Sequence, residues 1–280
     1  EGLKIFGSDF FRGFPSTFMP INDPAASSGY ILDVDDVLHI QMIGDKSSQF
    51  DIRIDRSGSI NSPDIGKIQV AGMTLKQAID YIDFKITSSF VETDVFISLK
   101  EIRDIQVLLT GMVHAPGIYT LSGYSSVIHA ISSAGGFKEN ASFREVLVKR
   151  NGNIHKRIDL YDFFIDGNMT SNISLMSGDS IIVRSSTNYI PVYGAVNQKA
   201  IFEFVDGESL KNIIYFAGGF KPNASKEIIV VRKNKNSYES IVLNENLDSF
   251  QLKKEDKVYI NHALYTPAEK YLNDRNDFRS

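Results

Sequence analysis

The sequence predicts an α+β protein in which a small folding unit occurs twice after a different N-terminal domain. The first observation is a repeat, because AGGFKENAS at residues 134–142 returns as AGGFKPNAS at residues 217–225. The second is that short runs of alternating apolar and polar residues, typical of half-buried strands, are separated by single segments with helical spacing. A chain of 280 residues with 42% hydrophobic residues is long enough for two or three such domains.

The repeat covers a whole unit and not only nine residues. Residues 107–121 align without a gap with residues 190–204, a shift of 83, and the same shift holds through the repeated nonapeptide. The shift falls to 77 where residues 175–183 meet residues 252–260. Six residues are therefore missing from the second copy, at a place where we expect a loop. A repeat of roughly 75 to 80 residues indicates a duplicated domain.

Both copies have the same order of predicted elements. A strand ends in a glycine, a short turn and a second strand follow, and a helix of roughly ten residues begins at Ser125 or Ser209 in the N-cap position. The helix ends at Ala-Gly-Gly, where a glycine can adopt the left-handed conformation that closes a helix. Further strands then complete a small β-grasp unit. The structural residues that we single out are Gly111, Pro116, Gly117, Tyr119, Gly135 and Gly136 in the first copy, and Gly194, Gly218 and Gly219 in the second.

A phosphate-binding loop is the alternative explanation of the paired glycines. Loops of that kind lie between a strand and the start of a helix, where free backbone N–H groups point outward. The glycines of both copies come at the end of the predicted helix instead. We therefore interpret the nonapeptide as a helix stop followed by a polar Asn-Ala-Ser turn.

Residues 29–104 predict a different α+β domain. Alternating apolar residues after Tyr30 indicate a strand with one polar face, and the turn residues at 56–58 indicate a hairpin. Thr74 is the expected N-cap of a helix over residues 75–90, after which a last strand leads out of the domain. The structural residues that we single out in this domain are Asp36, Gly44, Gly58, Pro63, Gly66 and Gly72.

Two segments flank the three domains, which we place at residues 29–104, 105–186 and 187–261. Residues 1–28 are rich in Phe, Pro, Ser and Gly without a clear period, so we interpret them as an extended arm. We expect this arm to pack on the N-terminal domain through its phenylalanines, which are Phe6, Phe10, Phe11, Phe14 and Phe18. The polar tail at residues 262–280 is expected to lead into a further part of the protein. The start at Glu1, with no Met and no signal peptide, indicates a processed or excised piece.

Composition and spacing exclude several classes of function. A net charge of −4 without a Lys/Arg-rich run speaks against nucleic-acid binding, and no apolar run approaches the roughly 18 residues of a membrane span. A chain without cysteine has no disulfide, no thiol nucleophile and no Cys-ligated zinc. The five histidines lack metal-ligand spacing, and Asp33, Asp35 and Asp36 fit a polar turn better than a calcium loop. We predict no metal, no cofactor and no catalytic residue.

A polysaccharide-cleaving enzyme is the weakest function that we considered. Asp159 and Asp162 could imitate the paired carboxylates of a glycosidase. They lie, however, in a segment that passes from strand to loop, with nothing in the sequence to mark a cleft. The chain also lacks the G-x-S-x-G motif of a nucleophile elbow.

The N-terminal domain resembles the polysaccharide export domain of the outer-membrane polysaccharide export (Wza-type) family. Residues 30–44 carry Y-x-L-x-x-x-D-x-L-x-I-x-x-x-G, the pattern that opens that domain, and the glycines and Pro63 continue the match. Asp33 and Asp35 depart from it, because members commonly carry glycines there. The arm resembles the lead-in of the longer, capsule-export members of this family.

The repeated unit resembles the SLBB domain, a β-grasp module named for soluble ligand binding. The resemblance rests on residues 109–119, with the spacing of Gly111, Pro116, Gly117 and Tyr119, and on AGGF at residues 134–137. The second copy is a looser match, with Lys199 and Ala200 at the positions of the proline and glycine of the turn.

The resemblance implies a non-enzymatic subunit of a capsule or exopolysaccharide export channel. Such proteins assemble into homo-oligomeric rings in the periplasm, associated with the outer membrane of Gram-negative bacteria, and the polymer passes through the ring. The implied partners are the polysaccharide and an inner-membrane polysaccharide co-polymerase or transporter. The alternative that we leave open is a soluble module of the periplasm that binds a glycan or another small ligand.

Overall fold

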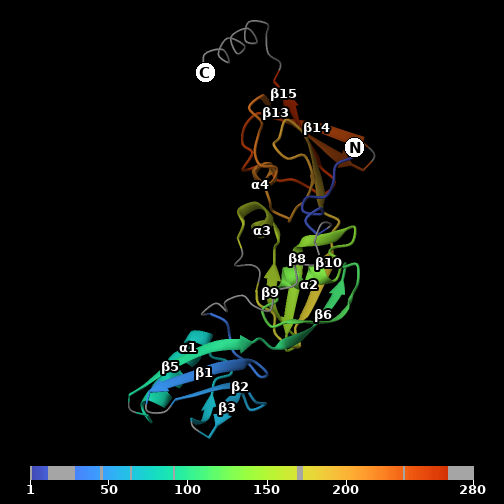
Figure 1. Cartoon of the computed structure of the whole chain (residues 1–280). Coiled ribbons are helices and arrows are strands. Elements are labelled where there is room, and N and C mark those ends of the chain that lie inside the picture. The colour runs from blue at the N-terminus through green and yellow to red at the C-terminus, as the bar shows by residue number, and fades with distance from the viewer. Residues whose placement is uncertain are drawn as a thin grey trace, which may run out of the picture.

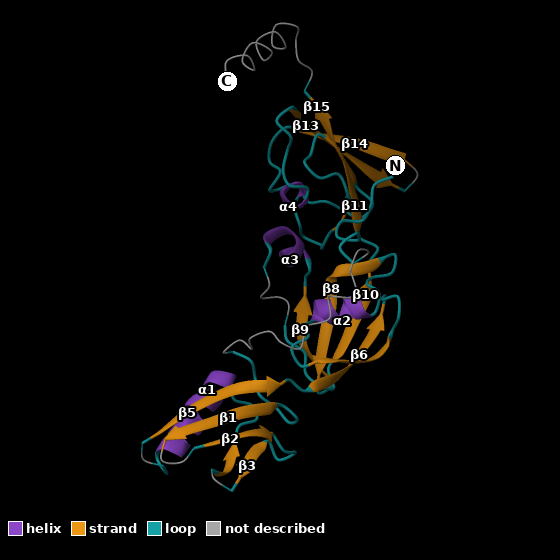
Figure 2. Cartoon of the chain, in the orientation of Figure 1, coloured by secondary structure: helices purple, strands orange, loops and turns teal. Residues whose placement is uncertain are grey.

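The computed structural model describes residues 2–11, 29–44, 47–63, 65–90, 92–168, 173–235 and 237–263. An N-terminal domain, a first repeat and a second repeat follow one another along the long axis of the molecule (Figure 1). Sheets dominate all three, and a few short helices pack on them (Figure 2). The prediction of an α+β protein with a duplicated unit is therefore confirmed.

The N-terminal domain is built on a three-stranded antiparallel sheet in the order β2-β1-β5, with a helix packed against β5. Its elements are β1 (Val37–Gly44), β2 (Ser48–Arg53), β3 (Ser59–Ser62), β4 (Gly66–Gln69), α1 (Leu75–Thr87) and β5 (Thr93–Glu101). The first strand alternates as predicted, because Leu38, Ile40 and Met42 are buried in the core.

Thr74 is the N-cap of α1, as predicted. Its hydroxyl accepts a hydrogen bond from the Gln77 N–H at 3.2 Å, and the Gln77 side chain accepts one from the Thr74 N–H at 2.9 Å. This reciprocal arrangement satisfies two of the N–H groups that a helix leaves unpaired at its start.

The hairpin expected across residues 56–58 is wrong in its pairing. β2 pairs with β1, whereas β3 pairs with β4 in a separate two-stranded sheet. The Asp55 carboxylate accepts hydrogen bonds from the N–H groups of Ser57 and Ser59 at 2.8 and 3.0 Å. The turn therefore carries the chain from one sheet into another, and turn residues alone do not specify whether the flanking strands pair.

The two repeats have the same sheet topology. The sheet orders are β7-β6-β10-β8-β9 and β12-β11-β15-β13-β14, and in each the central strand runs parallel to the first strand of the repeat. The first repeat consists of β6 (Asp104–Gly111), β7 (Gly117–Ser122), α2 (Val127–Ser133), β8 (Ala141–Arg150), β9 (Asn153–Ile158), α3 (Tyr161–Asp166) and β10 (Ser180–Ser185). The second consists of β11 (Tyr189–Gly194), β12 (Ile201–Glu203), α4 (Leu210–Phe216), β13 (Ala224–Asn234), β14 (Ser237–Leu243) and β15 (Lys257–His262).

The shift of 83 residues holds in three dimensions. A backbone bridge joins Val113 to Phe137 in the first repeat, and the corresponding bridge joins Val196 to Phe220 in the second. The bridges support the shift of 83 from the first hairpin to the nonapeptide. In the next strand the equivalent residues are Val146 and Ile228, which pair with Val183 and Ile260, so the shift there is 82.

The N-cap expected at Ser125 is wrong by one residue. Ser126 caps α2, and the hydroxyl of Ser125 is buried without a hydrogen-bond partner. In the second repeat Ser209 is the N-cap of α4, as predicted. Two adjacent serines, Ser125 and Ser126, could each cap the helix in the first repeat. The alignment of Ser209 with Ser126 indicates which of them does. Both helices have seven residues, fewer than expected.

The six residues absent from the second repeat correspond to more than a loop. In the first repeat this region contains α3, whose aromatic side chains pack at the boundary between the two repeats. The second repeat has only a turn over residues 247–249. The extra helix therefore belongs to the contact between the repeats, which a single repeat could not reveal.

The described part of the arm, residues 2–11, does not pack on the N-terminal domain, contrary to the prediction. It lies between the two repeats, where the N–H of Phe6 donates to the carbonyl of Ile201 at 2.9 Å. The N–H of Ile201 donates in turn to the carbonyl of Lys4 at 2.8 Å, so the arm extends the second sheet beside β12. Phe14 and Phe18 lie outside the described residues.

Aromatic contacts hold the arm in place. The Phe6 ring lies 5.1 Å from the ring of Tyr161 in α3 and 5.1 Å from the ring of Phe202 in β12. The Phe11 ring lies 5.0 Å from that of Phe137 in the first repeat. Phe6 and Phe11 join the cores of both repeats into one continuous apolar cluster, while the N-terminal domain has a core of its own.

Candidate functional site at the junctions between domains

The paired glycines connect the end of each short helix to the turn between the first two strands. The N–H of His114 donates to the carbonyl of Gly136 at 3.1 Å, and the N–H of Asn197 donates to that of Gly219, also at 3.1 Å. Both glycines have positive φ angles, of 81° and 82°. The repeated nonapeptide thus brings backbone carbonyls of the helix exit onto the hairpin turn, an arrangement that satisfies groups a helix end leaves unpaired.

Gly111 and Gly194 end the first strand of each repeat against the central strand. A Cβ atom on Gly111 would lie 2.0 Å from the carbonyl oxygen of Val183, and one on Gly194 would lie 1.9 Å from that of Ile260. Their φ angles are 87° and 93°, which side chains rarely adopt. Only glycine fits at these two positions.

The remaining residues singled out from the sequence stand at turns and strand ends. In the repeats, Pro116 lies in the exposed turn, Gly117 begins β7, the Tyr119 hydroxyl donates to the Ala115 carbonyl, and Gly135 and Gly218 precede the glycines of the helix exits. In the N-terminal domain, Gly44 ends β1, Gly58 precedes β3, Pro63 and Gly66 lie at the turn between β3 and β4, and Gly72 lies before α1.

Each repeat contains a buried ion pair that was not predicted from the sequence. Arg150 contacts Asp179 at 2.8 and 2.7 Å, and Arg232 contacts Asp256 at 2.9 and 2.7 Å, with both carboxylates fully buried. The arginines come from β8 and β13, and the aspartates from the turns before β10 and β15. A buried carboxylate requires such a partner. The two aspartates align at the shift of 77, but the two arginines are 82 residues apart, so the shift of 83 places Arg150 opposite Lys233 and hides the equivalence.

A similar pair joins the N-terminal domain to the first repeat. Arg103 donates to the Asp36 carboxylate at 2.7 Å and to the Tyr30 hydroxyl at 2.8 Å, and its backbone carbonyl accepts from the N–H of Gly123 at 2.8 Å. The Tyr30 ring stacks on that of Tyr124, with centroids 5.6 Å apart. Burial raises the pKa of Tyr30, so this hydroxyl stays protonated and donates to Asp36. Asp36 therefore holds Arg103 in place at the end of its domain, in addition to accepting a hydrogen bond within its own turn.

A buried carboxylate joins the first repeat to the second. Glu203 in β12 accepts hydrogen bonds from the Ser142 hydroxyl at 2.6 Å and from the N–H of Phe143 at 2.8 Å. The N–H of Glu203 donates to the Tyr161 hydroxyl at 2.7 Å. Burial raises the pKa of Glu203 above its usual value, because the charged form loses hydration that these bonds only partly replace.

Arg144 forms the second polar link between the repeats. It contacts Asp159 of its own repeat at 2.9 Å and Glu208 of the second repeat at 2.7 Å. Its guanidinium also lies 4.8 Å from the ring of Tyr161 and 5.1 Å from that of Phe216. Burial acts to lower the pKa of Arg144, but hydrogen bonds to the two carboxylates outweigh it and raise the value. The arginine thus remains charged and binds both repeats at once.

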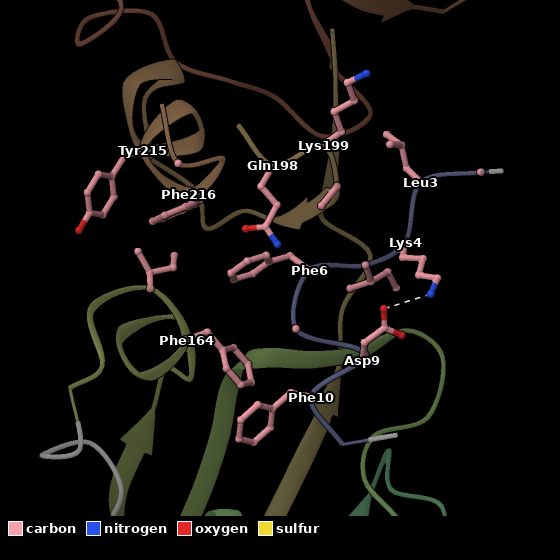
Figure 3. Close-up of a pocket in the computed structure, with 16 residues that line it drawn as sticks. Leu3, Lys4, Phe6, Asp9, Phe10, Phe164, Gln198, Lys199, Tyr215 and Phe216 are labelled. Atoms are coloured by element: carbon pink, nitrogen blue, oxygen red, sulfur yellow. Dashed lines mark hydrogen bonds and ion pairs between the residues drawn. The ribbon is translucent and has the colours of Figure 1, made fainter. Parts of the chain in front are cut away.

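A cleft of about 950 Å³ opens where the arm, α3 and the second repeat meet. Figure 3 shows Phe6 reaching from the arm into its middle, toward Phe216 and Phe164. Polar groups stand at the rim, among them Gln198 and the Lys4 ammonium, which contacts the Asp9 carboxylate at 3.1 Å. The combination of aromatic rings with amide, carboxylate and ammonium groups can bind a hydroxyl-rich or charged small molecule.

The acidic pair weighed as glycosidase carboxylates does not stand alone in a cleft. Asp159 is engaged by Arg144 and accepts a hydrogen bond from the N–H of Tyr161 at 2.9 Å. Its position is explained by the junction that it stabilises. In the described part of the chain there is no group of three or more side chains suited to hold a metal ion. Nor do the described residues include a helix with the length and apolar content that crossing a membrane needs.

Comparison with known proteins agrees with this division of the chain. Residues 24–100 match a family model described as polysaccharide biosynthesis/export protein, and residues 106–183 and 189–242 match two models of the SLBB domain. Two curated proteins of Escherichia coli, both named polysialic acid transport protein KpsD, are 28% and 27% identical over 207 residues. The match covers 72% of this chain but only 36% of each relative, so the chain spans about a third of their length.

The three models match in succession and meet near the junctions described above. Arg103, which links the first two domains, lies between the first two matched ranges, and β11 opens the third. The chain therefore consists of a polysaccharide export domain followed by two SLBB domains and is homologous to the polysialic acid transport protein KpsD.

Proposed function

We propose that this chain is part of a non-enzymatic subunit of a polysaccharide export channel in a Gram-negative bacterium. The subunits assemble into a ring in the periplasm, associated with the outer membrane, and a capsular or exported polysaccharide passes through it. An inner-membrane polysaccharide co-polymerase or transporter delivers the polymer. The observation that carries the proposal is the order of domains, one export domain followed by two SLBB domains, in a chain homologous to a polysialic acid transport protein.

The geometry of the chain supports a role as a wall element. A long polymer must slide, so a conduit needs a rigid surface with weak, repeated contacts rather than one tight site. The two SLBB domains share one apolar cluster and the polar links through Glu203 and Arg144. Such a pair can move as a single body, whereas the export domain keeps a separate core and is joined through Arg103.

Particle shape is the direct test of this proposal. The full-length protein, extracted from outer membranes under conditions that preserve membrane complexes, is imaged by electron microscopy. We expect closed rings with a central opening, and we expect a deletion strain to lose surface polysaccharide. Monomers or dimers without an opening, in a strain whose polysaccharide still reaches the surface after deletion, would rule out the channel.

A soluble glycan-binding or small-ligand module is the second candidate, favoured by the cleft that Phe6 enters. In that case the chain would bind an oligosaccharide tightly as a monomer, and Gln198→Ala at the rim would weaken binding. Asn153→Ala is the matched control, because Asn153 is an exposed amide at the start of β9 in the first repeat and does not line the cleft. Isothermal titration with capsule oligosaccharides separates the two candidates, since a conduit predicts weak binding that Gln198→Ala leaves unchanged.

A further inference from the structure

The two SLBB domains differ at the corner where each helix ends. We define the first corner as Gly136 with Phe137 and the second corner as Gly219 with Phe220. At the first corner the glycine is buried, and a Cβ atom on it would lie 2.6 Å from the Cβ of Phe11 in the arm. At the second corner a Cβ atom would meet nothing within 4 Å, and Phe220 is 40% exposed. The arm thus covers one corner, while no described residue covers its counterpart.

The shorter second repeat leaves open space beside this corner. In the first SLBB domain, Phe164 of α3 lies 6.3 Å from the Phe11 ring and 6.2 Å from the Phe143 ring, and so helps to close the region. The second SLBB domain lacks an equivalent of α3, and two adjacent hollows of about 480 and 260 Å³ remain. Both hollows are lined by Phe220 and Leu247.

The charge at the second corner favours an acidic partner. Lys221 and Lys226 line the smaller hollow, which has no acidic lining residue. Neither lysine forms an ion pair with another described residue. In the sequence alignment at a shift of 83, Lys226 falls opposite Phe143 of the first SLBB domain, and the ring of Phe143 packs 4.4 Å from that of Phe137. The second corner has therefore exchanged an internal aromatic contact for a free positive charge.

The arm shows which chemistry such a corner accepts. It approaches the first corner as an irregular segment in which Asp9 directly precedes Phe10 and Phe11. Aromatic rings pack edge to face in this contact, a geometry that adds to the effect of apolar burial. At the second corner, an aromatic ring between Phe220 and Leu247 would place a neighbouring carboxylate within reach of the two free lysines.

We propose that the second corner is a docking site for an irregular segment of a different protein that presents a phenylalanine next to an acidic residue. This inference goes beyond polymer export, because it assigns a protein partner to the outer end of the second SLBB domain. Its failure would leave the proposed channel untouched, since the channel is tested by particle shape and polysaccharide secretion.

The experiment uses the complete 280-residue chain, which contains no tryptophan. Phe220→Trp places a single fluorescent reporter at the second corner, and Phe137→Trp places a matched reporter at the first corner, beneath the arm. The probe is a synthetic peptide with the sequence of residues 7–11, Gly-Ser-Asp-Phe-Phe. We expect a saturable blue shift and protection from an added quencher with the first variant only.

Further variants test the chemistry of the site. A peptide with both phenylalanines replaced by serine should not bind. Lys221→Glu with Lys226→Glu, two exposed or half-exposed substitutions that leave the core intact, should weaken binding about tenfold at low salt. Circular dichroism and unchanged melting of each variant confirm that the fold is retained.

Three outcomes would overturn the proposal. The first is no saturable shift at the second corner, and the second is an equal shift with the reporter at the first corner. The third is a reporter at the second corner that is already blue-shifted and protected without peptide. In that third case the corner would be covered by the chain itself if the signal is independent of concentration, or by a second copy if the signal grows with concentration.

Discussion

The two SLBB domains have the same backbone and different surfaces. Their strands, helix exits and buried Arg–Asp pairs correspond position by position. On the outer face of the sheets, however, Thr110 and Ile182 of the first domain correspond to Tyr193 and Tyr259 of the second, whose rings stack 4.8 Å apart. The first domain is packed against neighbours at both ends, through Arg103 and through the arm. The second is packed at one end only, within the described residues.

This difference distinguishes the residues that the fold of each repeat requires from the residues that can vary with its neighbours. Backbone contacts at Gly111 and Gly194 determine whether the sheet closes, so they persist in both copies. Residues outside this backbone framework, such as the buried Phe143 and the exposed Lys226, differ because each domain has different neighbours on that side. The predictions below test this separation, from the largest expected effect to the smallest.

Gly194→Ala should destabilise the second SLBB domain by about 4 kcal/mol, because the new Cβ combines a disfavoured φ with overlap of the Ile260 carbonyl. Gly111→Ala should do the same to the first. Gly178→Ala is the matched control, with a φ of 86° and open space around the new Cβ, and should cost only about 1 to 2 kcal/mol. Urea denaturation followed by circular dichroism measures each. Equal losses at Gly194 and Gly178 would show that the close approach does not matter.

Asp256→Ala should cost about 3 to 5 kcal/mol, since it leaves the Arg232 charge without its buried partner. Asp179→Ala should cost a similar amount in the first SLBB domain if the two pairs are equivalent. Asp248→Ala, at an exposed pair with Lys211, is the control and should change stability by less than about 1 kcal/mol. Denaturant midpoints provide the measurement. If Asp256→Ala left the free energy of unfolding unchanged, the Arg–Asp pair would not be one of the contacts that stabilise both domains.

Phe6→Ala should release the arm and cost about 3 kcal/mol of the free energy that holds it between the SLBB domains. The Ile201 amide donates to the arm, so its hydrogen exchange should accelerate. The Lys221 amide lies at the uncovered corner and should be unaffected. Phe10→Ala, at a ring that is 37% exposed, is the milder control. Faster exchange at both amides would mean that the arm supports the whole second domain and not one junction.

Glu203→Gln should alter how stability depends on pH. The pKa of Glu203 is raised by burial, so the folded chain holds the proton more tightly than the unfolded chain. The stability that follows from this is present below the usual glutamate pKa and is lost as pH rises through the raised value. Glutamine is neutral at every pH, so the variant should gain in melting temperature relative to the natural chain between pH 4.5 and pH 7.5. Parallel melting curves at the two pH values would contradict this.

Much of the fold could be predicted from the chain alone, because its signals are local. The alternation through Leu38, Ile40 and Met42 and the cap at Thr74 depend on neighbours a few residues away. Because the unit is duplicated, each local signal occurs twice. Ser209 of the second copy aligns with Ser126, so a comparison of the two copies indicates Ser126 and not Ser125 as the N-cap. The position of the arm could not be found in this way, since apolar rings such as Phe6 fit any apolar surface.

The sequence by itself determined the order of the export domain and the two SLBB domains, together with the helices within them apart from α3. It did so because periodicity, caps and glycine turns act over short distances. Only the tertiary structure decided which side chains meet across domains: Tyr30 with Tyr124, Arg144 with Glu208, and the arm with one corner but not the other. The reason is physical. A charge or an aromatic ring has no fixed partner until folding removes water and leaves a single arrangement that satisfies it.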